Sequence, residues 1–304
     1  MNKTKTNGIE LAWDHFGDES AEPILLIAGL GTQMIRWTPA FCTTLAERGF
    51  RVIRFDHRDV GQSTHFDQYP APDLNALIAT LQSGQRPNLT YTLEDMAADA
   101  MGLLDVLGIK QAHVVGRSMG GMIAQLLASA WPERVLSLTS IMSSSGNPAL
   151  PAAAPDVMQL MTRPAPDPER DPAGFAAQGL AFARRIAGKG YLFDTEQQLA
   201  LLHEELRRGR SAGGFARQIA AIAVSGDRRS QLAAIVAPTL VIHGADDPLF
   251  SPECGADTAR AIPGAHFMLL EGMGHDLPAP LYATVAEAIT QNCRRPQLAR
   301  VNPT

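Results

Sequence analysis

The sequence predicts an α/β protein with a mostly parallel, twisted sheet and helices on both of its faces. Three observations predict this class. Short apolar runs alternate with segments of helical periodicity in the first half of the chain and again near its end, which is the pattern of β-α-β units. One apolar run leads directly into the turn pattern Gly-x-Ser-x-Gly at residues 116–120. Between residues 146 and 229, proline-rich and helical sequence interrupts the alternation, which indicates an insertion.

The N-terminal part is predicted to form strands joined by tight turns. Asn7-Gly8 is a hairpin signal, and apolar and polar residues alternate in Ile9–Trp13. Ile24–Ala28 and Arg51–Phe55 are apolar runs on either side of the helical pattern Pro39–Arg48. This β-α-β unit predicts a parallel strand pair with a right-handed crossover.

The middle of the chain continues the alternation. A helix is predicted from Thr92 to about Leu107, because a threonine cap followed by acids satisfies free amides, and Gly108 is expected to end it. The strand before residue 116 follows, and then the helix-forming run Met122–Ala130 and the strand Val135–Ile141.

The pattern divides the chain into a core, a cap and a tail. Residues 1–145 and 230–293 are predicted to form the core, residues 146–229 a helical cap inserted between core strands, and residues 294–304 a loose tail. The cap contains two helical segments, Ala173–Ala187 and Thr195–Arg208. After the cap the alternation resumes with the strand Thr239–His243, the helix Ser251–Ala261, the strand Ala265–Leu270 and the helix Pro280–Gln291.

Composition excludes several classes of partner. The net charge of −5 without a basic stripe argues against nucleic acid, and the longest apolar run, Ile24–Leu30, is too short to span a membrane. The N-terminus lacks the apolar core of a secretory signal, so a cytoplasmic protein is predicted. Cys42, Cys254 and Cys293 are odd in number and widely spaced, which predicts reduced packing thiols and neither a disulfide framework nor a zinc site.

The turn at residues 116–120 predicts a nucleophile elbow that raises the hydroxyl of Ser118 above the edge of the sheet. Gly116 and Gly120 are required sterically, because a side chain at either position would collide with the neighbouring backbone. The amide of Met119, at the start of the following helix, points to where an oxyanion would form.

A second Gly-x-Ser-x-Gly occurs at residues 209–213, around Ser211. An amphipathic charged run, Leu201–Arg208, precedes it in place of a buried strand. We therefore expect Ser211 to lie at a glycine-rich helix end or in a loop between helices, and Ser118 to be the nucleophile.

A serine hydroxyl needs a base and an acid, and in an α/β sheet these stand on loops at the carboxyl ends of strands. His275 lies in a Gly-rich turn directly after the strand that ends at Leu270, and is the predicted base. His243, at a strand end before a glycine, is expected to be structural. Asp247 is preferred as the acid, with Asp246 as the alternative and otherwise a solvated or turn-capping neighbour.

The second oxyanion donor is expected from the glycine-containing loop Ala28–Gln33, after an early strand, and the amide of Leu30 is the candidate.

With these residues in place, the chain resembles the α/β-hydrolase family over nearly its whole length. Ile27–Trp37 and Arg54–Thr64 are most similar to the aclacinomycin methylesterase type, and the elbow GRSMGG also resembles that of enol-lactonases and carbon–carbon bond hydrolases. The resemblance implies an α/β-hydrolase fold with Ser118, Asp247 and His275 as the catalytic triad and the Leu30 and Met119 amides as oxyanion donors.

Two further features follow from the resemblance. The family's usual His-Gly opening of the oxyanion loop is Ala28-Gly29 in this chain, as in some methylesterase-like members. The stretch Asp56-His57-Arg58 matches a family loop that is usually structural, so it is expected to hold the site and not to react.

The predicted function is hydrolysis of a small-molecule carboxylic ester, either a methyl ester, a small or apolar ester or a lactone, through an acyl-enzyme and without cofactor or metal. Two alternatives remain at this point. The same triad can support carbon–carbon bond hydrolysis of a vinylogous diketone or cofactor-free perhydrolysis. A non-catalytic binding protein can also keep the fold, although such proteins often lose a triad member, and every required residue type is present in this chain.

Overall fold

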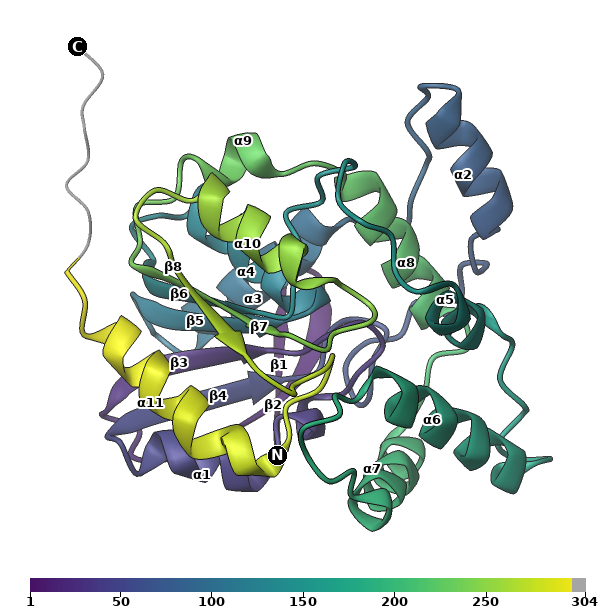
Figure 1. Cartoon of the computed structure of the whole chain (residues 1–304), viewed down its shortest axis with the longest axis horizontal. Coiled ribbons are helices and arrows are strands. Elements are labelled where there is room, and N and C mark those ends of the chain that lie inside the picture. The colour runs from purple at the N-terminus through teal and green to yellow at the C-terminus, as the bar shows by residue number, and fades with distance from the viewer. Residues whose placement is uncertain (297–304) are drawn as a thin grey trace.

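The computed structural model describes residues 1–296, and within them the chain forms one eight-stranded sheet of order β1-β2-β4-β3-β5-β6-β7-β8 with helices on both faces (Figure 1). The predicted fold class is confirmed. The strands are β1 Asn2–Thr6, β2 Ile9–Phe16, β3 Glu22–Ile27, β4 Phe50–Phe55, β5 Ala112–Arg117, β6 Val135–Ile141, β7 Thr239–Gly244 and β8 His266–Leu270.

Only the N-terminal end of the sheet is antiparallel. β1 pairs with β2, and β2 with β4, in antiparallel register, whereas β4, β3, β5, β6, β7 and β8 run parallel to one another. The β1–β2 hairpin turns at Asn7 and Gly8, whose φ angles of 47° and 76° both lie in the left-handed region that a type I′ turn requires. The predicted hairpin is therefore present.

Two layers of helices cover the sheet. Helices α1 (Pro39–Ala46) and α11 (Tyr282–Cys293) lie on one face, and α3 (Leu93–Val106), α4 (Met119–Ala130) and α10 (Pro252–Ala261) lie on the other (Figure 1). Strand β3 shows how both cores form. Leu25 and Ile27 join the core under α3 and α4, while Ile24 and Leu26 join the core under α1 and α11. Burial on both faces explains why this strand is a continuous apolar run.

The helices of the core begin and end close to the predicted positions. Thr92 caps α3 in a reciprocal pair with Asp95, and Gly108 follows the helix with a φ of 69°. Helix α4 begins at Met119, three residues before the expected run, because the elbow turn itself supplies its first turn.

The stretch between β6 and β7 is helical, as predicted, but it contains more helices than predicted. The described elements there are α5 Pro155–Thr162, α6 Pro172–Ile186, α7 Thr195–Arg208, α8 Gly214–Ser225 and the short α9 Arg229–Leu232. Helix α5 lies in the proline-rich stretch, and its proline occupies the first turn, where no amide donor is needed. Helix α2 (Leu74–Gln82), between β4 and α3, was also not predicted.

Buried ion pairs tie these helices to the loop after β4. Arg217 of α8 makes a two-pronged contact with the carboxylate of Asp59, at 2.7 and 2.9 Å, and Arg208 at the end of α7 donates to Asp56 at 2.5 Å. Burial opposes ionisation of Asp59, but hydrogen bonds from Arg217, the Phe66 amide and Tyr91, together with the charge of Arg217, outweigh burial and lower the pKa of that carboxyl. Charge pairing therefore contributes to holding α7 and α8 beside the core.

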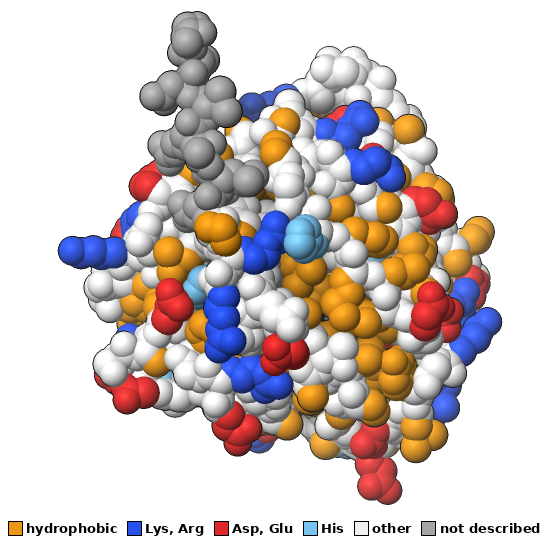
Figure 2. All heavy atoms as spheres, turned by 60° about the vertical axis from the view of Figure 1, so that its left-hand side comes forward, with side chains coloured by type: hydrophobic (Ala, Val, Ile, Leu, Met, Phe, Trp, Pro, Cys, Tyr) orange, Lys and Arg blue, Asp and Glu red, His pale blue; other side chains and the backbone are white. Residues whose placement is uncertain are grey.

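The two edges of the sheet differ in character. Edge strand β1 carries Lys3 and Lys5, which discourage pairing with another strand, whereas edge strand β8 exposes Phe267 and Leu269. On the face shown in Figure 2, hydrophobic side chains gather in the middle, and basic and acidic side chains are interspersed around them.

Two of the predictions concern membrane segments and the tail. No helix within residues 1–296 is both long and apolar enough to cross a bilayer. The predicted tail, residues 294–304, lies outside the described residues from position 297 onward.

The three cysteines are free, and Cys42 and Cys254 are buried. Burial raises the pKa of the Cys42 and Cys293 thiols to about 12 and also raises the pKa of Cys254. Because the thiolate is the reactive form and the raised pKa values disfavour it, we expect all three thiols to react slowly with a disulfide reagent in the folded protein at pH 8. Unfolding in urea should release three rapidly reacting thiols. A thiol that reacts stoichiometrically within the mixing time in the native protein would contradict this.

Candidate active site

The turn between β5 and α4 is a sharp elbow, as the glycine spacing predicts. Ser118 has a φ of 55° and a ψ of −124°, a strained conformation for a residue with a side chain. A Cβ at Gly116 would lie 2.0 Å from the carbonyl oxygen of Gly120, and a Cβ at Gly120 would lie 2.2 Å from that of Ile27. Both glycines are therefore required by direct backbone contact.

The structure brings Ser118, His275 and Asp247 together. The Nε2 atom of His275 lies 2.9 Å from Ser118 Oγ, and its Nδ1 lies 2.7 Å from Asp247 Oδ2. The three residues follow β5, β7 and β8, so all stand at the carboxyl ends of parallel strands. An imidazole that contacts a hydroxyl on one side and a carboxylate on the other can move a proton from the hydroxyl.

The surroundings of Asp247 keep it ionised. Its Oδ1 accepts hydrogen bonds from the amides of Leu249 and Phe250, both at 2.9 Å. Burial by itself would raise the pKa of Asp247, but the positive charge of protonated His275 and hydrogen bonds from His275 and His243 outweigh burial and hold it well below its usual range.

The neighbouring Asp246 has a different role. It is exposed, and its Oδ2 accepts a hydrogen bond of 3.0 Å from the amide of Lys189, in the segment between α6 and α7. The contact with His275 thus belongs to Asp247, the residue preferred from the sequence, and Asp246 binds the segment between α6 and α7.

The end of α6 and the segment after it also contact the backbone of the turn that carries His275. The amide of His275 donates to the carbonyl of Ile186 at 2.7 Å, and the amide of Gly190 donates to the carbonyl of Gly272 at 3.0 Å. These backbones touch so closely that a Cβ at Gly188 would lie 2.0 Å from the Gly272 oxygen. Sequence reasoning missed this contact. The sequence does contain a feature that could have indicated the contact, namely the glycine pairs 188/190 and 272/274, because glycines allow two backbones to approach closely.

The two amides expected to bind an oxyanion are free among the described residues. Met119 is the first residue of α4, where an amide has no acceptor within the helix. In the loop after β3, the amide of Gly31 donates to Gln218 Oε1 and that of Thr32 to the carbonyl of Gly29, while the Leu30 amide between them has no acceptor in residues 1–296. Gly29 packs against Ser118, since a Cβ there would lie 3.4 Å from the Ser118 Cβ.

The stretch Asp56-His57-Arg58 supports this loop without reaching the reacting atoms. Asp56 accepts from the amide of Met34 at 2.8 Å, and His57 Nε2 lies 2.9 Å from the carbonyl oxygen of Ala28. Burial lowers the pKa of His57 to about 4, so it is neutral at pH 7. Arg58 forms a buried ion pair with Asp99 at 2.6 Å.

Ser211 lies in the loop between α7 and α8, as expected. Its hydroxyl is 2.6 Å from Asp67 Oδ1 and 3.2 Å from Asp59 Oδ1, and Arg217 donates to it at 2.9 Å. Carboxylates and a guanidinium surround this hydroxyl, and none of these groups is an imidazole that could act as its base. The second Gly-x-Ser-x-Gly is a structural loop.

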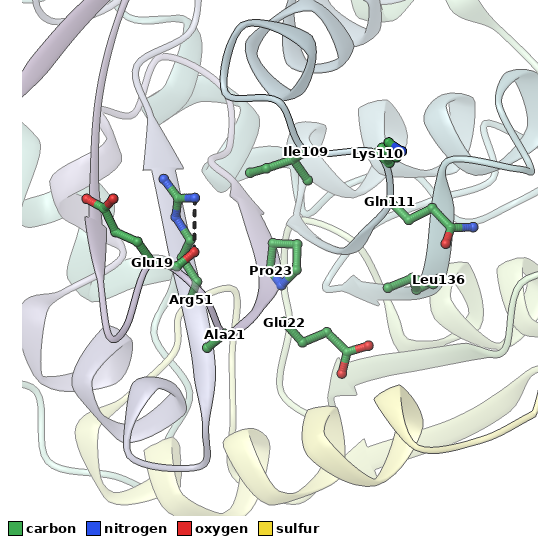
Figure 3. Close-up of a pocket in the computed structure, with 9 residues that line it drawn as sticks. All are labelled: Glu19, Ala21, Glu22, Pro23, Arg51, Ile109, Lys110, Gln111 and Leu136. Carbon is green, nitrogen blue, oxygen red and sulfur yellow. Dashed lines mark hydrogen bonds between the residues drawn. The ribbon is translucent and has the colours of Figure 1, made fainter.

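The surface pocket of about 350 Å³ in Figure 3 is separate from this site. Its lining includes Glu22 at the start of β3, Arg51 near the start of β4 and Leu136 near the start of β6. These are the amino ends of the parallel strands, whereas Ser118 lies at their carboxyl ends. Within residues 1–296, no group of three His, Cys, Asp or Glu side chains is arranged to hold a metal ion.

Comparisons with known proteins agree with this architecture. Residues 22–278 match the alpha/beta hydrolase fold family. The chain is 31% identical over 301 residues to the rhodomycin D methylesterase DauP of Streptomyces sp. (strain C5), covering 91% of this chain and 93% of that protein.

Solved structures share the fold. The enol-lactonase from Burkholderia xenovorans LB400 aligns with a TM-score of 0.68 at 24% identity, covering 95% of this chain and 97% of that one. The meta-cleavage product hydrolase from Pseudomonas fluorescens IP01 aligns with a TM-score of 0.74 at 17% identity, covering 96% and 97%.

The backbone contact at Gly120 yields a stability prediction. In Gly120→Ala the new Cβ would overlap the carbonyl oxygens of Ile27 and Ala28, and because backbone cannot yield cheaply we expect a loss of about 2–3 kcal/mol in the free energy of unfolding. Urea denaturation measures it. Ser129→Ala in the same helix removes one hydroxyl and adds no atom, so it should cost much less. Equal stability of Gly120→Ala and the parent protein would rule out the steric requirement.

Proposed function

Because the chain belongs to the alpha/beta hydrolase family, we propose that it is a carboxylic ester hydrolase that works through Ser118, His275 and Asp247. The observation that carries the proposal is the pair of contacts made by His275, 2.9 Å to the serine oxygen and 2.7 Å to the carboxylate. The methylesterase relative supports ester hydrolysis as the reaction.

In the first half of the proposed reaction, His275 Nε2 takes the proton of Ser118 as Oγ attacks the ester carbonyl. Asp247 accepts a hydrogen bond from the Nδ1–H of His275, so it fixes the tautomer and stabilises the imidazolium that forms. The carbonyl π electrons move to oxygen, and the Leu30 and Met119 amides donate to that oxyanion. Each donor of this kind typically contributes about 3 kcal/mol to the transition state.

In the second half, the tetrahedral intermediate collapses. The carbon–oxygen bond to the leaving alcohol breaks, and the imidazolium gives that alcohol its proton. Water then attacks the acyl-serine and loses a proton to His275 Nε2, and the second collapse releases the acid and restores the Ser118 hydroxyl. In that second collapse the imidazolium gives its proton to Ser118 Oγ. His275 thus gives up each proton that it takes, and no step requires a cofactor.

The proposed substrate is a methyl ester, another small or apolar ester, or a lactone. Similarity to a methylesterase along 91% of the chain favours an ester. An apolar ring also lies beside the proposed base, since Phe250 packs edge-on against His275 with 5.6 Å between ring centroids. We propose that residues 146–229 form a cap over a core of residues 1–145 and 230–293, and that this cap completes the binding site.

The experiment that tests the function is labelling with a fluorophosphonate, followed by peptide mapping. We expect the adduct on Ser118, and Ser118→Ala should lose labelling and at least about 10³-fold of p-nitrophenyl acetate turnover. Ser211→Ala is the matched control, because it alters the second Gly-x-Ser-x-Gly and should keep both. An unlabelled chain, or an adduct on Ser211, would contradict the proposal.

The two adjacent aspartates give a second test. Asp247→Asn presents an amide that cannot hold the His275 tautomer, so we expect kcat to fall by about 10⁴-fold while the protein stays folded. Asp246→Asn alters only the contact with the Lys189 amide and should keep kcat within about threefold. Steady-state kinetics of both variants on one ester decides between them. If kcat falls further in Asp246→Asn than in Asp247→Asn, Asp246 and not Asp247 is the catalytic acid.

A further inference from the structure

His243 is a fully buried histidine that the mechanism above does not use. It lies near the carboxyl end of β7, four residues before Asp247, and its side chain has no exposed surface. Its Nε2 is 2.8 Å from the carbonyl oxygen of Phe250 and 3.4 Å from Asp247 Oδ2. One ring nitrogen thus faces both the turn that carries the acid and the acid itself.

The contacts define which nitrogen carries the proton. A carbonyl oxygen can only accept, so Nε2 is the donor to Phe250. The other nitrogen, Nδ1, is buried with no hydrogen-bond partner within residues 1–296. It rests against helix α10, where a Cβ at Gly255 would lie only 2.5 Å from it.

Phe250 connects this histidine to the rest of the triad. Its amide donates to Asp247 Oδ1 at 2.9 Å, its carbonyl accepts from His243, and its ring packs edge-on against the His275 ring. The carboxylate of Asp247 therefore has its two oxygens held from different sides. Oδ1 is held by the amides of its own turn, and Oδ2 lies between His275 at 2.7 Å and His243 at 3.4 Å.

We propose that His243 is a positioning residue for the catalytic acid: its Nε2–H holds the turn at residues 247–250 and, through it, the direction of the Asp247 carboxylate toward His275. This inference rests on the proposed function, because it assigns no chemistry of its own to His243. The sequence predicted a structural role for His243. The proposal keeps that role and adds that the structure it supports is the turn that carries Asp247.

The proposal predicts the effect of removing the donor while keeping the bulk. In His243→Leu the Phe250 carbonyl and Asp247 lose the Nε2–H, and we expect kcat to fall by about 10-fold to 100-fold with KM little changed. With one donor fewer, more of the carboxylate charge is available to the imidazolium of His275. The midpoint of the acidic limb of kcat/KM should therefore move to higher pH. Further titratable groups face these residues: Glu253 on α10 acts on His243, Cys254 on α10 acts on Asp247, and Asp276 acts on His275.

His243→Gln is the rescue variant, since a glutamine amide nitrogen can reach the position of Nε2. It should recover most of kcat and return the acidic limb toward its original midpoint. His113→Leu is the matched control. His113 is also a buried strand histidine, bound to Ser137 at 2.8 Å, but it lies at the amino end of β5. It should lower the melting temperature and leave kcat and the pH profile of the folded protein unchanged.

Gly255→Ala tests the same contact from the other side and does not remove His243. Its new Cβ would overlap Nδ1 and push the imidazole toward the turn, so kcat should fall. Gly102→Ala is the matched control, because it also adds a Cβ where another side chain lies too close. Gly102 is on α3, and its Cβ would lie 2.0 Å from Oγ1 of Thr6 in edge strand β1, far from Asp247. It should destabilise the protein without changing kcat.

The outcomes separate this inference from the proposed function. If the fluorophosphonate labels Ser118 and Ser118→Ala is inactive, while His243→Leu and Gly255→Ala both keep the parent kcat and acidic limb, only the role of His243 is overturned. If Ser118 is not labelled and Ser118→Ala still turns over ester, the proposed function falls and this inference falls with it.

Discussion

The backbone contact between the turn after β5 and the end of β3 is the constraint on which the site depends. Gly116 touches Gly120 within the turn, and Gly120 touches the carbonyls of Ile27 and Ala28. The contact lets β5 lie beside β3 and forces Ser118 into its positive φ. The same contact brings the Leu30 loop beside the nucleophile. One close approach thus positions both the hydroxyl of the proposed nucleophile and the Leu30 amide beside it. Parallel pairing through β6, β7 and β8 then brings Asp247 and His275 to the same end of the strands.

The parts of the fold that could be predicted are those whose sequence pattern is local. The apolar run of β3 and the Thr92–Asp95 cap of α3 need no knowledge of distant residues. The choice between Asp246 and Asp247 needed such knowledge, because adjacent side chains in a turn point in opposite directions and the turn is held by Lys189, far away in the chain. The same reason hid the role suggested for His243, whose partner Phe250 is defined only once the turn has formed.

A serine, a histidine and a carboxylate in contact do not by themselves make the serine a nucleophile. His113 Nδ1 lies 2.8 Å from Ser137 Oγ and its Nε2 lies 3.4 Å from Glu22. The same three kinds of side chain as in the proposed triad therefore meet at the amino ends of the parallel strands. Ser137 is buried within β6 and no elbow raises it, so no substrate carbonyl can reach its hydroxyl. The distinguishing property of Ser118 is its half-buried position on a strained turn at a helix N-terminus. Access and backbone direction, which a motif does not encode, decide between them.

Polar contacts are prominent in holding helices α6 and α7 beside the sheet. Neither α6 nor α7 has a fully buried residue, so hydrophobic burial contributes less to holding them than it does for the core helices. Their placement depends on contacts such as the two-pronged ion pair of Arg36 with Glu205, at 2.8 and 2.7 Å, and the Ile186 carbonyl on the His275 amide at 2.7 Å. Segments held in this way open at lower free energy than a packed core. One of these contacts is made by the amide of His275, so the position of the proposed base depends on the placement of α6.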